Sequence, residues 1–273
     1  MTNATEQSQM PTLYIPHGGG PCFFMDWTMG PANTWDKMQR WLTQLGDTLQ
    51  PVPKAIVVIS AHWEGDVVTI NNGAHPPLLY DYYGFPEHTY QLKYPAPGAP
   101  ALAGKIAALF SASGISSTTD AERGYDHGVF IPLLLAYPDA NIPIVQVSLN
   151  ATLDPAFHLQ MGQALASLRN EGVLIIGSGM SYHNMKKLMQ QDSPNRESDQ
   201  FDAWLTASCA LPAEERDKQL CLWSNAPAAR DAHPREEHLI PLMVIAGAAG
   251  DDIGTQVFSD RVMGAAVSAY QFG

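Results

Sequence analysis

The chain has 273 residues, of which 45% are hydrophobic, and its formal net charge is −12. The apolar content is sufficient for a sizeable core, while the negative charge disfavours nucleic acid or an anionic membrane as a partner. Three cysteines without a C-x-x-C pair, together with the lack of a signal peptide and of any run of about 18 apolar residues, predict a cytoplasmic protein with reduced thiols and no transmembrane segment.

The first half of the chain alternates strand-like and helix-like segments. Residues 1–10 are polar and are expected to form a disordered leader. Strands are predicted at 12–16, 54–61 and 67–70, and helices at 33–45, 99–113 and 127–137. Residues 71–100, which contain six prolines, are too long for an ordinary connection, so we expect a functional loop that walls a pocket.

The second half continues the alternation and then becomes mainly helical. Strands are predicted at 142–149, 173–176 and 265–272, and helices at 155–169, 198–210, 213–223 and 234–247. The strand at 173–176 is expected to enter a turn at Gly177–Met180. Because no linker rich in Pro, Gly or Ser divides the chain, we predict one α/β domain over residues 11–273, with a central, largely parallel or mixed sheet flanked by helices.

Three histidines end or closely follow predicted strands: His17, His62 and His183. Imidazoles from several strand ends can converge at one edge of an open α/β sheet and build a metal or catalytic site there. His17, which precedes three glycines, is either a ligand facing a pocket or a turn histidine bonded to the backbone. His62 is either a ligand or a satisfied histidine at a sheet end. If their two strands are neighbours, both rings can reach one divalent ion.

Two further histidines have contexts that suit catalysis. His127 opens an apolar helix, where the helix dipole disfavours its cation, so a neutral ring could donate a hydrogen bond to substrate or to an anionic oxygen. The alternative is a simple helix-start histidine capped by Asp126. His183 lies in a polar run that suits a general base in a cleft, with core packing as the alternative.

The remaining histidines have weaker signals. His233 and His238 are five residues apart and do not share a helical face, so at most one should ligate the same ion. Taken alone, their segment is typical of a solvated acidic helix start. His75 and His158 are expected to be solvated, and His88 is a pocket candidate because it lies in the 71–100 loop.

Seven short stretches, in this order along the chain, resemble the LigB-type (class III) extradiol ring-cleavage dioxygenases, and most of all their DOPA 4,5-dioxygenase-like branch. The stretches are Pro16–Gly20, Ile59–Trp63, Tyr80–Pro86, Tyr94–Gly98, Asp126–Gly128, Gly177–Met180 and His233–Leu242. Each is weak alone, whereas the ordered set is specific. The resemblance implies extradiol cleavage of a catechol, L-DOPA or a related aromatic, with O2, giving a yellow semialdehyde.

The resemblance also implies a metal site. It makes His17 and His62 ligands and draws the third ligand from the helix expected to begin at Pro234. This branch has a histidine there, which points to His238, with Glu237, His183 and His233 as alternatives. Such a facial triad leaves positions for a catecholate and O2. The implied cofactor is Fe(II), and Zn(II) could occupy the same site.

The same resemblance assigns roles around the metal. It makes His183 the base that takes a proton from a catechol hydroxyl, and His127 a hydrogen-bond partner of substrate or oxygen. Predicted substrate contacts are His88, Tyr90 and Tyr182. His88 stands where relatives are expected to have another residue, which bears on substrate choice.

Two other functions stay open at this point. A zinc-dependent hydrolase would also use imidazoles around a water-bearing metal. A non-catalytic metal-binding relative on the same fold is the other alternative, because fold does not determine function. The presence of both His127 and His183 beside the ligand set favours an enzyme.

Overall fold

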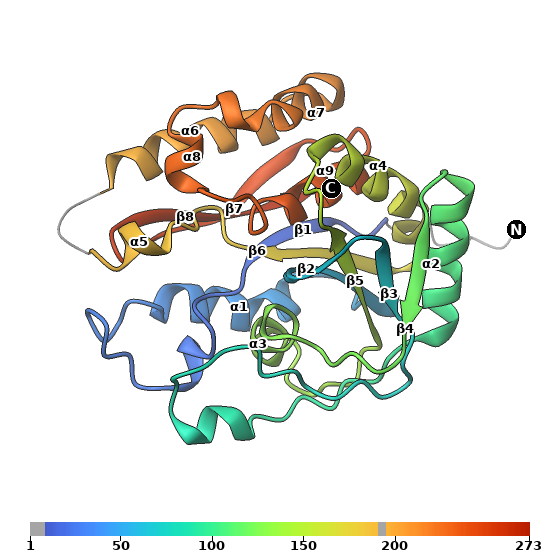
Figure 1. Cartoon of the computed structure of the whole chain (residues 1–273), viewed down its shortest axis with the longest axis horizontal. Helices are drawn as coiled ribbons and strands as arrows, with labels where there is room; N and C mark the ends of the chain where they lie inside the picture. The colour runs from blue at the N-terminus through green and yellow to red at the C-terminus, as the bar shows by residue number, and fades with distance from the viewer. Residues whose placement is uncertain (1–8, 191–194) are drawn as a thin grey trace, which may run out of the picture.

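Eight strands form one mixed sheet in the computed structural model, which describes residues 9–190 and 195–273 (Figure 1). The strand order is β4-β3-β5-β2-β6-β1-β8-β7. The strands are β1 (Thr12–Pro16), β2 (Ala55–Gly65), β3 (Val68–Asn71), β4 (Ser117–Asp120), β5 (Ile144–Asn150), β6 (Val173–Gly179), β7 (Gly254–Val262) and β8 (Ala265–Phe272). The four central strands are parallel, whereas β3 on β5, β8 on β1 and β7 on β8 are antiparallel. This confirms the predicted α/β class with a largely parallel, mixed sheet.

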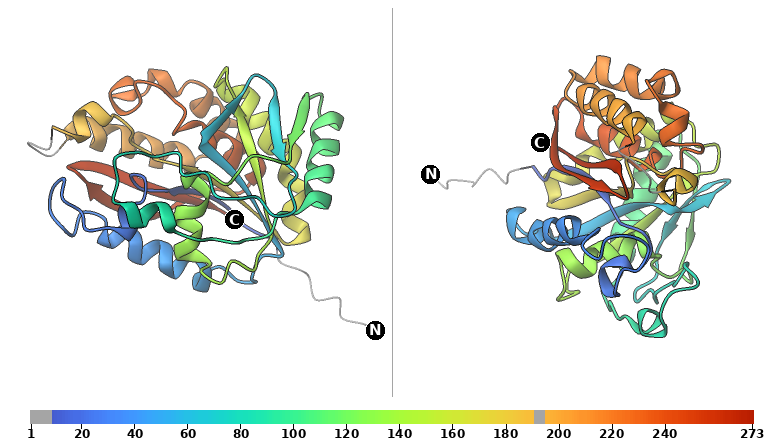
Figure 2. Two further views of the ribbon diagram at one scale, coloured as in Figure 1. Left: turned by 60° about the horizontal axis from the view of Figure 1, so that its bottom comes forward. Right: turned by 90° about the vertical axis from the view of Figure 1, so that its left-hand side faces the viewer.

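Helices cover both faces of this sheet. They are α1 (Asp36–Thr48), α2 (Pro100–Ala112), α3 (His127–Ala136), α4 (Pro155–Leu165), α5 (Met185–Leu188), α6 (Arg196–Cys209), α7 (Ala213–Cys221), α8 (Ala229–Ala232) and α9 (Ile240–Ala249). Helices α1 and α3 lie on one face, and α4, α6 and α9 lie on the other (Figures 1 and 2). Because the central strands are buried on both faces, their sequences are continuous apolar runs, as at Ile56–Ile59. Within residues 9–190 and 195–273, no helix combines the length and apolarity needed to cross a bilayer.

Two strands were not predicted from the sequence, and both lie at the edges of the sheet. Strand β4 has the polar sequence Ser-Thr-Thr-Asp and contains no buried residue. Strand β7 pairs only with β8 and is largely exposed or half-buried. An edge strand needs no apolar run because one of its sides faces solvent, so periodicity alone does not reveal it.

The expected turn at Gly177–Met180 is wrong, because β6 continues through Gly179. A Cβ at Gly179 would overlap the carbonyl oxygen of His238, and a Cβ at Gly177 would lie 2.7 Å from the carbonyl oxygen of Pro241. The glycines therefore do not bend the chain. They let the segment that leads into α9 pack directly against a central strand.

The helix expected at 234–247 begins later, at Ile240, and His238 lies in the turn before it. That turn is held by two hydrogen bonds to the carbonyl oxygen of His238, from the Tyr14 hydroxyl at 2.6 Å and from the Met180 N–H at 3.2 Å. The prediction of a solvated segment is wrong, since His233 and His238 are both buried. Each is bonded to a segment more than fifty residues away, His233 to the Ser181 carbonyl and His238 through its own carbonyl to Tyr14 and Met180, so local sequence did not reveal their burial.

His158 was also expected to be solvated and is instead fully buried. Its Nδ1 bonds with the Asp154 carbonyl oxygen at 2.7 Å, and its Nε2 accepts from the Asn150 N–H at 3.1 Å. His75 is exposed as expected. The first eight residues of the predicted leader lie outside the described residues, while Met10 is buried and donates its N–H to the Arg169 carbonyl.

Candidate active site

Histidines meet at the carboxyl ends of the parallel strands β1, β2 and β6. This end of the sheet faces the viewer in the right panel of Figure 2. His17 follows β1, and His62 lies among the last residues of β2. Strand β6 separates these two strands, so they are not adjacent. The rings nevertheless meet, with 2.8 Å between His17 Nε2 and His62 Nε2.

His238 completes a triangle with His17 and His62. The ring centroids are 4.8 Å apart for His17 and His62, 5.2 Å for His17 and His238, and 4.9 Å for His62 and His238. One nitrogen from each ring lies within 4.8 Å of the other two. Three convergent imidazole nitrogens form a donor set that suits zinc or Fe(II).

Hydrogen bonds behind the rings determine which nitrogens face the centre. The His17 Nδ1–H donates to the Gly179 carbonyl at 2.9 Å, and the His238 Nδ1–H donates to Glu237 Oε1 at 2.9 Å. These partners assign the tautomers and leave a lone pair on each Nε2. The pKa values of His17 and His62 lie well below the ordinary value for histidine, and the pKa of His238 is lowered to about 3. Burial is the main cause in all three cases. The rings are therefore neutral, as metal ligation requires.

Glu237 stands behind the histidines. Its Oε1 lies 3.3 Å from His183 Nδ1 as well as accepting from His238, and its Oε2 lies 3.4 Å from an Arg235 nitrogen. Burial opposes its ionisation, but the hydrogen bonds from the two histidines and the charge interaction with His238 together hold the pKa of Glu237 well below its usual range. His183, Glu237 and His238 lie close enough to hold an ion themselves. We favour the triangle of three histidines, since both Glu237 oxygens already have partners.

His233, another alternative ligand, lies apart from the triangle. Its Nε2 bonds with the Ser181 carbonyl oxygen at 3.0 Å, and burial is the main cause that lowers its pKa to about 3. The ring packs against Phe201 and Trp223. Its surroundings are those of a structural histidine.

His183 lies against the triangle. Its ring stacks on His238 with a centroid distance of 3.4 Å and an interplanar angle of 18°. With Nδ1 directed at Glu237, the Nε2 of a neutral His183 is free to accept a proton. Its side chain is 23% exposed, so it is reachable from the cavity that it lines.

His127 is held by Asp81, a residue that sequence reasoning did not single out. Asp81 Oδ1 accepts from the His127 backbone N–H at 2.9 Å and from its Nδ1–H at 2.8 Å. Burial opposes ionisation of Asp81, but the bonds from His127 outweigh it and lower the pKa of the carboxyl. With Nδ1–H engaged, a neutral His127 accepts at Nε2, and it donates there only as the imidazolium.

Asp126, expected as the cap of this helix, makes no capping bond. It is buried and accepts from the Ser60 hydroxyl at 2.7 Å and from Arg123 at 3.3 Å. Arg123 also donates to the His62 carbonyl at 3.1 Å. Asp126 therefore stabilises the end of β2, where His62 lies.

Asp81 lies 46 residues from His127 in the sequence, so no local spacing connects the two. Only the position of Asp81 within the Tyr80–Pro86 stretch could have drawn attention to it.

A cavity of about 490 Å³ opens above the histidines. Five histidines lie in its wall: His17, His62, His127, His183 and His238. The 71–100 segment contributes Tyr82, Tyr83 and Phe85, so it walls the pocket as its length and composition predicted.

The three predicted substrate contacts are not among the residues that line this cavity. His88 is exposed, and its Nε2 bonds with the Phe24 carbonyl oxygen at 2.9 Å. Tyr90 is half-buried and packs against Tyr82, with ring centroids 5.2 Å apart. Tyr182 is buried, and its hydroxyl accepts from Asn195 at 2.5 Å.

Comparisons with known proteins identify the family of the chain. A family model described as the catalytic LigB subunit of aromatic ring-opening dioxygenase matches residues 11–273. The chain is 43% identical to a 4,5-DOPA dioxygenase extradiol of Beta vulgaris over 273 residues, which cover 98% of each chain. It is 37% identical to dioxygenase tasH of Hapsidospora irregularis, over 99% of this chain and 87% of that one.

A solved structure shows the same fold. The crystal structure of an uncharacterized protein from Escherichia coli K12 matches with a TM-score of 0.78 and 31% identity, over 97% of this chain and 100% of that one. The family model spans nearly the whole chain, and identities above 30% extend over most of it. The chain therefore belongs to the LigB family of class III extradiol, aromatic ring-opening dioxygenases.

Proposed function

We propose that this protein is a non-haem Fe(II) dioxygenase that cleaves the ring of a catechol, L-DOPA or a related aromatic, outside its two hydroxyls. The observation that carries the proposal is the convergence of three neutral imidazoles, His17, His62 and His238, in the wall of a cavity that also contains His183 and His127. The reaction adds both atoms of O2 to the catechol, so it needs no further reductant.

The donor set fits a divalent ion. All three nitrogens belong to neutral rings, so they leave the charge of the ion uncompensated, which favours an anionic catecholate as a further ligand. Glu237 stands behind this set as an outer carboxylate that orients the ligating His238, and Asp81 holds the neighbouring His127 in the same way. Bound Fe(II) would supply the redox chemistry that allows O2 to react with an aromatic ring.

His183 and His127 would handle protons on the substrate. His183 accepts a proton from one catechol hydroxyl at Nε2, while its Nδ1–H stays directed at Glu237, which stabilises the cation that forms. His127 holds the substrate through its own Nε2, because its Nδ1–H is bonded to Asp81. Its ring lies beside that of His62, with centroids 3.9 Å apart.

The test is anaerobic loading with Fe(II), followed by a panel of catechols in air, with O2 consumption and the visible absorbance of a yellow semialdehyde as readouts. One O2 should be consumed per catechol. No O2 uptake and no coloured product across the panel would contradict the proposal.

A zinc hydrolase is the second candidate, because three histidines are also the ligand set of catalytic zinc. A hydrolase would act on an ester or amide under nitrogen as well as in air. Turnover that requires O2 and follows Fe(II) rather than Zn(II) content separates the two.

A further inference from the structure

We infer that the pocket selects catechols whose ring substituent is uncharged and largely apolar, in preference to substituents that carry a carboxylate or an amino-acid group. The inference rests on the proposed catechol cleavage and names the substrate class for it. It is carried by what lines the cavity beyond its histidines.

The described part of the cavity wall contains no charged side chain outside the histidines. Among the described residues that line it, none is Lys, Arg, Asp or Glu. The wall above the histidines consists of three glycines, five aromatic side chains, one leucine and five methionines. A carboxylate or ammonium in such a site would lose water without gaining a partner of opposite charge.

Methionines form much of the outer wall. Five of the eleven methionines of the chain line this cavity: Met29, Met180, Met185, Met189 and Met263. Met185 and Met189 are about half exposed, at 51% and 53%. Flexible thioether side chains adapt to irregular apolar shapes, so this rim suits a hydrophobic substituent of variable form.

Two tryptophans add hydrogen-bond donors without charge. Trp27 and Trp35 line the cavity, are more than nine-tenths buried and contact each other edge to face, with centroids 5.3 Å apart. Neither indole N–H has an acceptor among the described residues. A neutral carbonyl or ether oxygen on the substituent could accept from an indole N–H that it reached, whereas a carboxylate would still lack a cation there.

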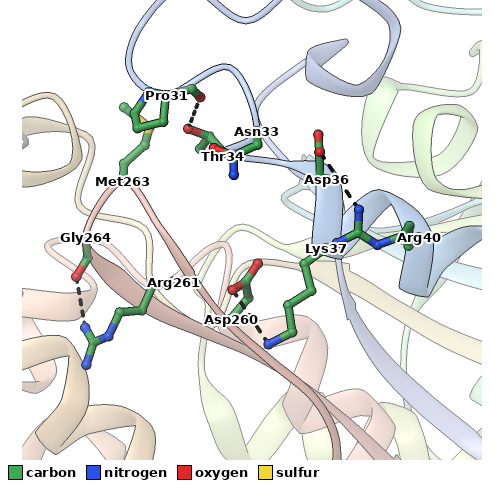
Figure 3. A pocket seen from close by; sticks show the side chains of 10 residues that line it. All are labelled: Pro31, Asn33, Thr34, Asp36, Lys37, Arg40, Asp260, Arg261, Met263 and Gly264. Carbon is green, nitrogen blue, oxygen red and sulfur yellow. Dashed lines mark hydrogen bonds and ion pairs between the residues drawn. The ribbon is translucent and has the colours of Figure 1, made fainter.

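Basic residues next to lining residues in the sequence or in the neighbouring groove do not alter this picture. Lys186 and Lys187 lie in α5 between two lining residues, but neither lines the cavity, and Lys187 is ion-paired with Asp231. Lys37 and Arg261 line a separate groove that shares only Met263 with the cavity (Figure 3).

The test compares a matched pair of ligands, 3-(3,4-dihydroxyphenyl)propionate and its methyl ester, which differ by one charge. Dissociation constants are measured by calorimetry on Zn(II)-loaded and on metal-free protein, where no turnover interferes, and L-DOPA is included. The ester should bind about tenfold or more tightly than either charged ligand, because burial of the unpaired charge is costly. Equal or tighter binding of the acid or of L-DOPA would overturn the inference, as would absence of binding by the ester.

Paired variants of the rim sharpen the result. Met189→Lys places a cation at an exposed position of the wall and should reverse the preference toward the acid, while Met189→Gln, of similar size and neutral, should not. If the unmodified protein prefers the acid and Lys186→Gln abolishes that preference, charge is read at the rim and the inference fails.

Binding and turnover separate this inference from the proposed function. A selective ester complex in Fe(II)-loaded protein that consumes no O2 would contradict the dioxygenase proposal and leave the apolar selection intact. Turnover with higher kcat/KM for L-DOPA than for the ester would support the dioxygenase proposal and contradict the apolar selection.

Discussion

Two neighbouring cavities share Met263 and are otherwise chemical opposites. The groove in Figure 3 is rich in charge, and each of its cations has a carboxylate nearby. Lys37 lies 3.7 Å from Asp260, Arg40 lies 3.9 Å from Asp36, and Arg261 lies 2.5 Å from Asp199. These are surface pairs that already satisfy one another.

The histidine cavity carries little charge, but it contains hydrogen-bond donors that have no acceptor among the described residues. His17 and His238 direct lone pairs inward while their other nitrogens are hydrogen-bonded behind them. The convergence of unpaired groups of one kind, rather than the number of charges, therefore distinguishes the candidate active site from the groove. Variants in the two cavities should therefore differ greatly in effect.

The largest effect is expected from His17→Ala. Removal of one of three nitrogens should weaken metal binding by more than about a hundredfold, since loss of an outer partner alone costs about 10–100-fold. Metal content after dialysis, measured by plasma mass spectrometry, should fall close to zero, and turnover should be lost with it. His75→Ala, at an exposed histidine, is the control. Full metal content in His17→Ala would remove this residue from the ligand set.

His183→Ala should separate metal binding from catalysis. The ring contacts the triangle but is assigned no ligand role, so metal content should be unchanged while kcat falls by about 10²–10⁴-fold, the usual contribution of a general base. Parallel measurement of metal content and O2 consumption checks this. Loss of the metal together with activity would instead make His183 a ligand.

Glu237→Gln should have an intermediate effect. The amide keeps an oxygen for the His238 Nδ1–H but loses the charge that polarises the ring, so metal affinity should fall by about 10–100-fold. Competition with a fluorescent zinc chelator measures the change. Glu236→Gln is the matched control, because the Glu236 carboxylate pairs with Arg230 instead. Equal affinities of the two variants would show that Glu237 does not support the site.

The central fold follows from sequence because burial on both faces leaves a clear signal. The Ile- and Val-rich runs of β2 and β6 predicted these strands, and the histidines at their ends predicted where a site would form. Strands β4 and β7 escaped because edge strands carry no such run. Local sequence pattern therefore predicts the central strands and the site at their carboxyl ends, but it does not predict the edge strands.

Two residues of the site depended on contacts distant in sequence. His238 has the local context of a solvated turn, and its place near His17 follows from bonds of its carbonyl to Tyr14 and Met180. Only the family resemblance singled it out. Asp81 reaches His127 across 46 residues, and no spacing rule connects a loop carboxylate to a helix start so far away.

The smallest effects are expected in the charged groove, with Lys37→Met and Arg261→Met. Both side chains are about half exposed, at 58% and 49%, and exposed ion pairs contribute about 0–1 kcal/mol. Each variant should lower the free energy of unfolding in urea by less than about 1 kcal/mol. Each side chain also donates to a backbone carbonyl, Lys37 to Ser259 and Arg261 to Gly264. Lys37 in addition lies 5.9 Å from the Phe258 ring centroid, so its loss should be the larger of the two.

Metal affinity and kcat/KM toward a neutral catechol should not change in either groove variant, because Met263 alone connects the groove to the histidine cavity. Unfolding curves and steady-state kinetics on the same preparations test both statements together. A fall in kcat/KM beyond about tenfold without loss of stability, equivalent to about 1.4 kcal/mol in the barrier, would mean that the groove acts on the reaction. The contrast between the two cavities would then be one of polarity and no longer one of function.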